Sequence, residues 1–145
     1  MQPFSANGPK RLLFVCVENS NRSQMAEAFA RIHGSDAVMA FSAGSNPSGN
    51  INPKAIEAMS AVGYDLSKHQ SKSLNDLPKI EFDFVVTMGC GDECPFVCAH
   101  RRQDWKIPDP RNMSDYEFRS VRDLIEANVI ALLRDLRVTG HLRSI

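Results

Sequence analysis

The sequence lacks net charge, long hydrophobic runs and an ATP-type phosphate loop, and each absence excludes a class of protein. Its 17 basic and 17 acidic residues cancel, which argues against a nucleic-acid-binding surface. No apolar stretch approaches the length needed to cross a membrane, and residues 1–9 lack the charged start and apolar core of a signal peptide. No Gly-Lys-Ser/Thr follows a glycine-rich stretch. We therefore expect a cytoplasmic protein without an ATP-type nucleotide site, a nucleic-acid-binding surface or a membrane-spanning segment.

Cysteine is also scarce, but its placement is informative. Cys16 stands alone near the amino end, whereas Cys90, Cys94 and Cys98 cluster. In a cytosolic chain of this size, four cysteines are more often catalytic or metal-binding than paired in structural disulfides. The cysteines therefore mark candidate sites of chemistry.

The segment between Cys16 and Arg22 has the composition of an anion-binding loop. An apolar run leads into Cys16, and a helical pattern starts just after Arg22. The intervening residues can wrap so that their backbone N–H groups converge at the positive end of the helix. There the Cys16 thiol should ionise readily and act as a nucleophile, Arg22 can hold two anion oxygens with its planar guanidinium, and Ser23 can hydrogen-bond the thiolate. The predicted oxyanion-binding residues are Val17, Glu18, Asn19, Ser20, Asn21 and Arg22.

Cys16 alone could instead be a buried core thiol. That interpretation does not explain an arginine and two asparagines, Asn19 and Asn21, at the same turn. We therefore favour the anion site.

The apolar periodicity predicts strands alternating with helices. Strands are expected at 11–15, 37–42, 82–88 and, more weakly, 104–107, and helices at 23–34, 52–63 and 114–140. This pattern predicts an α/β fold with a parallel sheet covered on both sides, whose ligands bind beyond the carboxyl ends of the strands. Cys16, Cys90 and Asp109 each follow a predicted strand. We expect one domain over 10–145 and a flexible N-terminal segment over 1–9.

Several side chains carry expectations about caps and burial. Asn52 is a plausible N-cap with Pro53 at the first helical position, and Ser114 with Glu117 forms a capping box. Trp105 should lie in the core, and His33, His69 and His141 at the surface or at helix ends. The predicted apolar helix faces are Met25, Phe29 and Ile32; Ile56, Met59 and Val62; and Phe118, Val121, Leu124, Ile125, Leu132 and Leu136.

The segment Cys16 to Ser23, the Ala43-Gly44 turn, the run Val85 to Met88 before a thiol, and Asp109-Pro110 resemble the low-molecular-weight tyrosine phosphatase superfamily, and within it the arsenate reductases. The resemblance covers residues 10–137. It implies a single-domain three-layer sandwich in which helices flank a four-stranded parallel sheet. It also implies roles: Cys16 as nucleophile, Arg22 as oxyanion clamp, Asn19 as the residue that shapes the loop, Ser23 as the thiolate-stabilising hydroxyl and Asp109 as general acid.

Two positions depart from the family pattern. Glu18 stands where the family commonly has glycine, and its carboxylate must point away from the anion because it would otherwise repel it. In related reductases the second thiol often directly follows the strand, whereas here Gly89 occupies that place and Cys90 comes next.

Arsenate reduction needs two electrons, which the cysteines can supply. After Cys16 displaces an oxygen of bound arsenate, a second thiolate attacks the Cys16 sulfur, arsenite leaves and a disulfide remains. We assign the second thiol to Cys90 and the third, which carries the oxidation to the surface, to Cys94, with Cys98 in reserve. An external reductant, either thioredoxin, glutathione with glutaredoxin, or a similar thiol, then restores the enzyme. We expect no tightly bound cofactor and no metal.

Other functions stay open at this point. A low-molecular-weight protein tyrosine phosphatase would hydrolyse phosphotyrosine through a phosphocysteine with Cys16, Arg22 and Asp109 alone. Such phosphatases usually carry aromatic residues after the Asp-Pro pair, where this chain has Arg111-Asn112-Met113. A catalytically silent anion-binding or metal-binding module is the third possibility.

Individual residues also have simpler explanations. The cysteine cluster with His100 could hold zinc, although its spacing is unusual for such a site. Cys98 could be structural, and Asp109 between two prolines could be a turn residue.

Overall fold

The computed structural model describes residues 8–89 and 99–136. Strands and helices alternate along most of the chain. They are β1 (Lys10–Cys16), α1 (Arg22–Gly34), η1 (Ser35–Ala37), β2 (Val38–Gly44), α2 (Pro53–Ser60), η2 (Leu66–Lys68), η3 (Leu74–Asp76), β3 (Phe82–Thr87), β4 (Ala99–Asp104) and α3 (Asp115–Asp135), where η denotes a short 3-10 helix.

The strands form one parallel sheet in the order β2-β1-β3-β4. Cys16 pairs with Gly44 on β2, and Val15 pairs with Thr87 on β3. The chain leaves β1 toward β2 and returns on the other side to β3, so the strand order reverses between β1 and β3. A crevice for ligands opens at the carboxyl ends of two strands that diverge in this way. The predicted α/β fold with a four-stranded parallel sheet is confirmed.

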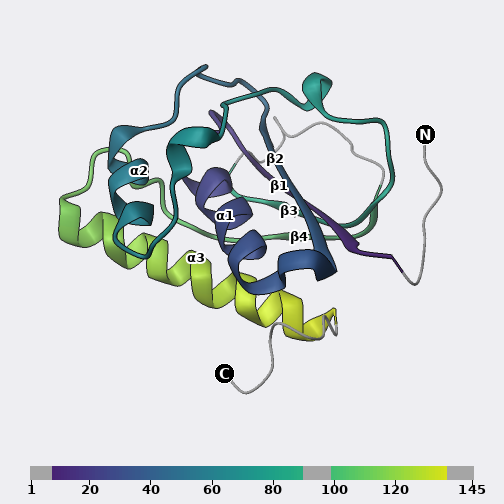
Figure 1. Cartoon of the computed structure of the whole chain (residues 1–145). Helices are drawn as coiled ribbons and strands as arrows, with labels where there is room; N and C mark the ends of the chain where they lie inside the picture. Colours follow the sequence, from purple (N-terminus) through teal and green to yellow (C-terminus); the bar gives the residue numbers. More distant parts are fainter. Residues whose placement is uncertain (1–7, 90–98, 137–145) are drawn as a thin grey trace.

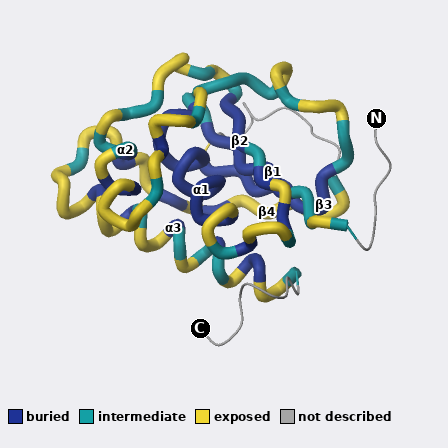
Figure 2. Tube along the Cα trace, viewed as in Figure 1, coloured by how far each residue is buried: buried dark blue, intermediate teal, exposed yellow. Residues whose placement is uncertain are grey.

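The alternation of side chains along β1 divides the core into two parts. Leu12, Phe14 and Cys16 face the helices, whereas Leu13 and Val15 face the opposite side. Helix α1 packs directly on β1 and β2, and α3 packs along α1 and α2 (Figure 1). The opposite face is covered by the segment around η3, through Leu74, Leu77 and Ile80. Figure 2 shows the result, with α1 and the central strands buried and the outer side of α3 exposed.

The caps and most core positions agree with the sequence analysis. The Asn52 side chain accepts a hydrogen bond from the Lys54 N–H, and both bonds of the Ser114–Glu117 capping box are present. Trp105 is buried, as predicted. Of the residues predicted on apolar helix faces, Ile32, Val62 and Leu124 are 40–42% exposed, and Val62 lies beyond the end of α2.

The weak strand expected over 104–107 is wrong in position. The fourth strand is β4, Ala99–Asp104, an edge strand with exposed side chains from His100 onward. Such a strand has no apolar alternation to reveal it. Trp105 and Ile107, which suggested the strand, are buried residues that follow its end.

Some expectations lie outside the described residues. These include Cys90, Cys94, Cys98 and His141, most of the flexible segment expected over 1–9 and the helix end expected at Gly140. Helix α2 ends at Ser60, earlier than predicted. No helix among the described residues is long and apolar enough to span a membrane.

Candidate active site

The loop after β1 is held in place by hydrogen bonds that its backbone carbonyl oxygens accept from other segments. A second loop, residues 45–52, donates to them: Ser45 N–H to Cys16 at 3.1 Å, Asn46 N–H to Val17 at 2.8 Å, Ser48 N–H to Glu18 at 3.1 Å and Asn52 N–H to Ser20 at 3.2 Å. The Asn19 carbonyl accepts from the Gln24 side chain at 3.1 Å. Every carbonyl from Cys16 to Ser20 is therefore engaged on the outer side of the loop.

The amide groups of the loop are consequently left for a ligand. In a planar trans peptide the N–H points opposite to the C=O, so outward carbonyls turn the N–H groups of Val17 to Asn21 inward. Among the described residues, none of these N–H groups donates to a protein acceptor. The segment therefore forms the cup of amides that the sequence predicts, of the kind that binds anions.

The N-terminus of α1 opens into the same cup. Asn21 is its N-cap residue but makes no side-chain cap bond, whereas the caps of α2 and α3 are satisfied. An uncapped N-terminus leaves partial positive charge for a bound anion.

Cys16 lies at the floor of the cup with its sulfur hydrogen-bonded. The sulfur is 2.9 Å from Ser23 Oγ, and that oxygen already accepts from Asn19 Nδ2 at 2.8 Å. Because a thiolate can only accept, Ser23 donates its own hydrogen to Cys16 when the thiol is ionised. The bond that the sequence predicts between Ser23 and the Cys16 sulfur is thus present.

Asn19 is fixed in an unusual conformation. Its φ is 53°, in the left-handed region that asparagine tolerates better than most residues. The backbone N–H of Lys72 donates to Asn19 Oδ1 at 3.0 Å. A backbone N–H cannot accept, so this bond settles the amide orientation and points Nδ2 at Ser23.

Arg22 is buried beside the cup and is held by a distant carbonyl. Its Nη1 donates to the Ile107 oxygen at 3.0 Å. Gly89, just after β3, packs against the guanidinium, where a Cβ would lie 2.5 Å from Nη1. With a φ of 78°, Gly89 also occupies backbone space that favours glycine.

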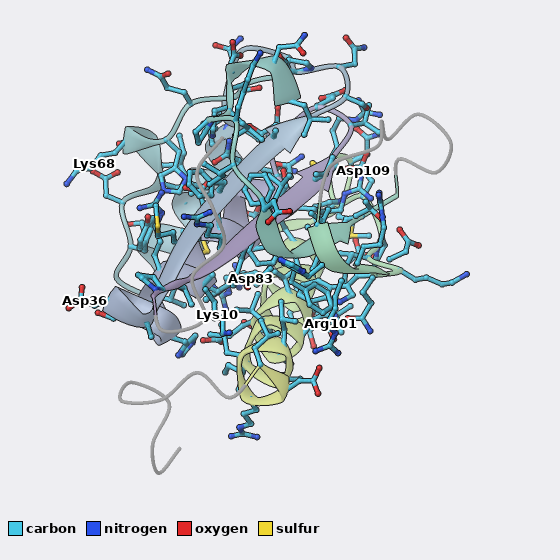
Figure 3. The ribbon with its side chains drawn as sticks, turned by 90° about the vertical axis from the view of Figure 1, so that its right-hand side faces the viewer. Lys10, Asp36, Lys68, Asp83, Arg101 and Asp109 are labelled. Atoms are coloured by element: carbon cyan, nitrogen blue, oxygen red, sulfur yellow. The ribbon has the colours of Figure 1, made fainter. Side chains whose placement is uncertain are left out.

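Cys16, Arg22, Gly89 and Asp109 all line one cleft of about 300 Å³. Figure 3 shows Asp109 at the end of the sheet toward which β1 runs, opposite Lys10 at the start of that strand. Asp109 Oδ1 accepts from the Arg111 N–H at 3.1 Å, so its carboxylate also orders a turn. The fold therefore brings together the predicted nucleophile, anion clamp and acid.

One feature of this cleft, an ion pair of Glu18, was not predicted from the sequence. Glu18 Oε2 is 2.8 Å from Arg111 Nη1 in an ion pair that spans 93 residues. The sequence signal for this ion pair was the charge of Glu18 alone, since an acidic residue in an anion-binding loop needs a cation nearby.

His69 lies at the end of η2, in agreement with a helix-end position, but its side chain is only 9% exposed and is therefore not a surface group. Gln24 Nε2 faces the carbonyl oxygens of Asn19 and Gln70, so Gln24 Oε1 accepts from His69 Nδ1–H at 2.8 Å. In the neutral ring, His69 Nε2 then accepts from the Tyr64 hydroxyl at 2.6 Å. A chain of hydrogen bonds therefore runs from this ring through Gln24 and Asn19 to Ser23.

Burial shifts the titration of this region. Desolvation lowers the pKa of His69, against the opposing effect of Glu27, and raises the pKa of Tyr64. The pKa of Lys72 is lowered by burial, again opposed by Glu27. The Glu27 carboxylate is itself buried between Arg31, at 2.8 Å, and the Ser42 hydroxyl, at 2.6 Å. The neutral form of His69 is thus the one that the fold favours.

No group of three or more histidine, cysteine, aspartate or glutamate side chains is arranged to hold a metal within residues 8–89 and 99–136. The zinc alternative depends on Cys90, Cys94 and Cys98, which lie outside that part of the chain.

Comparison with known proteins shows which family the chain belongs to. The sequence profile of the low molecular weight phosphotyrosine protein phosphatase family matches residues 11–141. The chain belongs to this family. Its curated relatives in this family are named as arsenate reductases rather than as phosphatases. Arsenate reductase 1 of Staphylococcus epidermidis is 40% identical over 124 residues, covering 83% of this chain and 92% of that protein.

Two further relatives agree. The glutaredoxin arsenate reductase of Synechocystis sp. is 35% identical over 127 residues, covering 86% of this chain and 96% of that protein. A solved structure of an arsenate reductase in the phosphate-binding state superposes with a TM-score of 0.78 at 33% identity, covering 90% of this chain and 99% of that one. In each of these three comparisons, the similarity extends over nearly the full length of the relative.

Proposed function

We propose that this chain is an arsenate reductase that uses Cys16 as its nucleophile and passes the resulting oxidation to an external thiol reductant. The observation that carries the proposal is the Cys16 sulfur at the floor of a cup of amides, beside Arg22 and Asp109. The names of the relatives, at 35–40% identity, support arsenate as the anion.

The first step forms a bond between sulfur and arsenic. The inward N–H groups of the loop and the Arg22 guanidinium bind the oxygens of arsenate, which is tetrahedral and anionic. The Cys16 thiolate attacks arsenic, and one oxygen leaves as water after Asp109 gives it a proton. Ser23, which Asn19 orients, donates its hydrogen to the thiolate before attack.

The second step reduces arsenic. The thiolate of Cys90 attacks Cys16 Sγ, so that a disulfide forms while the bond between sulfur and arsenic breaks. The electron pair of that bond stays on arsenic, which goes from the +5 to the +3 state and leaves as arsenite.

The third step restores Cys16. The Cys94 thiolate attacks the Cys90 sulfur, which frees Cys16 and moves the disulfide to Cys90 and Cys94; Cys98 is the reserve for this role. A thiol reductant, such as thioredoxin or glutaredoxin with glutathione, then reduces that disulfide.

The decisive experiment is arsenate turnover with a reducing system, comparing the native protein with Cys16→Ser and Cys90→Ser. Both variants should lose arsenite production entirely, since serine has no sulfur with which to bond arsenic or to form a disulfide. Protection of Cys16 from alkylation by inorganic phosphate is the matched control for Cys90→Ser, because binding of the anion needs the loop around Cys16 but not Cys90. A Cys90→Ser variant that reduces arsenate as fast as the native protein would contradict the scheme.

The same assay addresses the phosphatase alternative, in which Cys90→Ser changes nothing and arsenate is not reduced. Mass mapping of the disulfide after one turnover without reductant then identifies the second and third thiols. We expect Cys90 joined to Cys94.

A further inference from the structure

Glu18 places a negative charge in a loop that binds an anion, and the Arg111 guanidinium forms an ion pair with that charge. The two side chains are joined at 2.8 Å, although they come from opposite parts of the sequence. Arg111 is also tied to the candidate acid, because its N–H donates to Asp109 Oδ1 at 3.1 Å and its Nη2 lies 3.9 Å from Asp109 Oδ2. The ion pair thus connects the anion loop to the Asp109 turn.

The ion pair also lies at a boundary between two hollows. Glu18 and Arg111 line the cleft that contains Cys16, and both line a second groove of about 240 Å³. The other residues that line that groove are Ser20, Asn21, Ser48, Asn50, Ile51, Asn52 and Pro53. Together, the two side chains therefore form part of the wall of each hollow.

We infer that the Glu18–Arg111 ion pair is a specificity bar, which restricts the anion site to bare tetrahedral oxyanions and excludes phosphate monoesters that carry a ring. This inference rests on the proposed function, because it concerns the anion that the Cys16 cup accepts.

The position of the leaving group supplies the reason. A group displaced by Cys16 departs opposite the attacking sulfur and must lie beside the acid that protonates it. Arg111 occupies the space beside Asp109, and Glu18 holds it there. The oxygen that leaves arsenate as water is small enough for this space, whereas a phenyl group would have to displace the guanidinium and break the ion pair.

Charge explains why the two residues act together. A bare Glu18 carboxylate would repel a bound anion, and the Arg111 guanidinium cancels that repulsion. Loss of Arg111 alone should therefore weaken anion binding, whereas loss of both side chains should restore it and widen the cleft.

The test measures binding without arsenate turnover. The rate at which iodoacetamide alkylates Cys16 is followed by mass spectrometry of the Cys16 peptide, with inorganic phosphate or phenyl phosphate as the protecting anion. The variants are Arg111→Ala, Glu18→Gly and the double variant, with thermal melting to confirm folding. Arg119→Ala removes an exposed arginine of α3 that lines neither hollow, and it is the charge-matched control.

We expect the native protein and Arg119→Ala to prefer phosphate to phenyl phosphate. Arg111→Ala should bind phosphate about three- to fivefold more weakly, the effect of one exposed unpaired charge. Glu18→Gly, which keeps the arginine, should bind phosphate at least as tightly as the native protein. The double variant should recover phosphate binding. Its affinity for phenyl phosphate relative to phosphate should rise about tenfold, since the obstructing side chains are gone.

Two results would overturn the inference: an Arg111→Ala variant that binds phosphate like the native protein, or a double variant with the native ratio of phenyl phosphate to phosphate. Neither depends on whether the chain reduces arsenate. Failure of the proposed function would appear instead as native binding of phosphate without arsenite production.

Discussion

At the scale of single residues, Asn19 shows how one side chain sets both backbone and chemistry. Its left-handed φ of 53° makes the turn of the loop. Its Oδ1 accepts from Gln24 at 2.8 Å and from the Lys72 N–H at 3.0 Å, and its Nδ2 donates to Ser23. The residue that bends the anion loop is therefore also the one that aims the Ser23 hydroxyl at the Cys16 sulfur.

Gly89 provides a prediction at this scale. Gly89→Ala should weaken phosphate binding about tenfold, since the new Cβ forces the Arg22 guanidinium out of place and a charged hydrogen bond to the anion is lost. Protection of Cys16 from alkylation by inorganic phosphate measures the effect.

Gly63→Ala is the matched control for this variant. Gly63 has a φ of 88° but nothing within 4 Å of its Cβ position, so alanine there carries a similar backbone strain without touching the site. Both variants should lose about 1 kcal/mol of unfolding free energy, and only Gly89→Ala should lose binding. Equal phosphate binding by the two variants would contradict the role given to Gly89.

At the scale of elements, the helices differ in how they begin. Helix α2 has the Asn52 cap and α3 has the Ser114 capping box, and both caps satisfy amides at the start of the helix. Helix α1 has no side-chain cap bond at Asn21. Since a free helix N-terminus favours a bound anion, α1 is the helix built for a ligand, and the other two are built for stability.

Ser114→Ala tests the second half of that statement. It should lower the free energy of unfolding by about 1 kcal/mol, because the Glu117 N–H loses its acceptor. Urea denaturation at neutral pH measures the loss.

Ser120→Ala on the same helix is the control for this measurement. Its hydroxyl donates only to the Tyr116 carbonyl, so its removal should change stability little. Phosphate binding should be native in both variants, and a binding defect in Ser114→Ala would show that α3 has a role beyond stability.

At the scale of the whole molecule, the anion loop depends on segments far from it in sequence. Residues 45–52 hold its carbonyl groups, Lys72 holds Asn19, and Ile107 holds Arg22. The buried His69 joins this framework through Gln24, with its pKa lowered by desolvation.

This burial predicts a pH dependence of stability. With a folded-state pKa below the ordinary value near 6.5, the unfolded chain binds more protons at His69 than the folded chain does. The stability that depends on the neutral ring is therefore fully present above about pH 6.5 and is lost as the pH falls through 6.5 toward the lower folded-state pKa. Urea denaturation between pH 7.5 and 5 should show this loss, and His69→Gln should reduce it.

Tyr64→Phe is the control for the pH experiment. It removes the hydroxyl that bonds His69 Nε2 but keeps the buried imidazole, so it should lower stability at every pH and retain the pH dependence. If His69→Gln and the native protein lost stability equally between pH 7.5 and 5, the assignment to His69 would be wrong.

The features that the sequence determined by itself are local. The spacing of Cys16, Arg22 and Ser23 at the junction of a strand and a helix predicted the anion loop, because a helix N-terminus and its preceding turn form from neighbouring residues. The Asn52 and Ser114 caps were readable for the same reason. The alternation of elements sufficed for a parallel sheet and for placing Cys16 at its carboxyl edge, whereas Asp109 was placed there from a strand expected over 104–107 that the structure has at Ala99–Asp104.

Only the tertiary structure decided the features that join distant segments. Nothing near β4 in the sequence marks it as an edge strand, since its partner is β3 and its side chains face solvent. The burial of His69 depends on contact with Tyr64 and with Gln24 of α1, and the Glu18–Arg111 pair spans 93 residues. Such contacts depend on how the chain packs in space, and local composition carries no record of them.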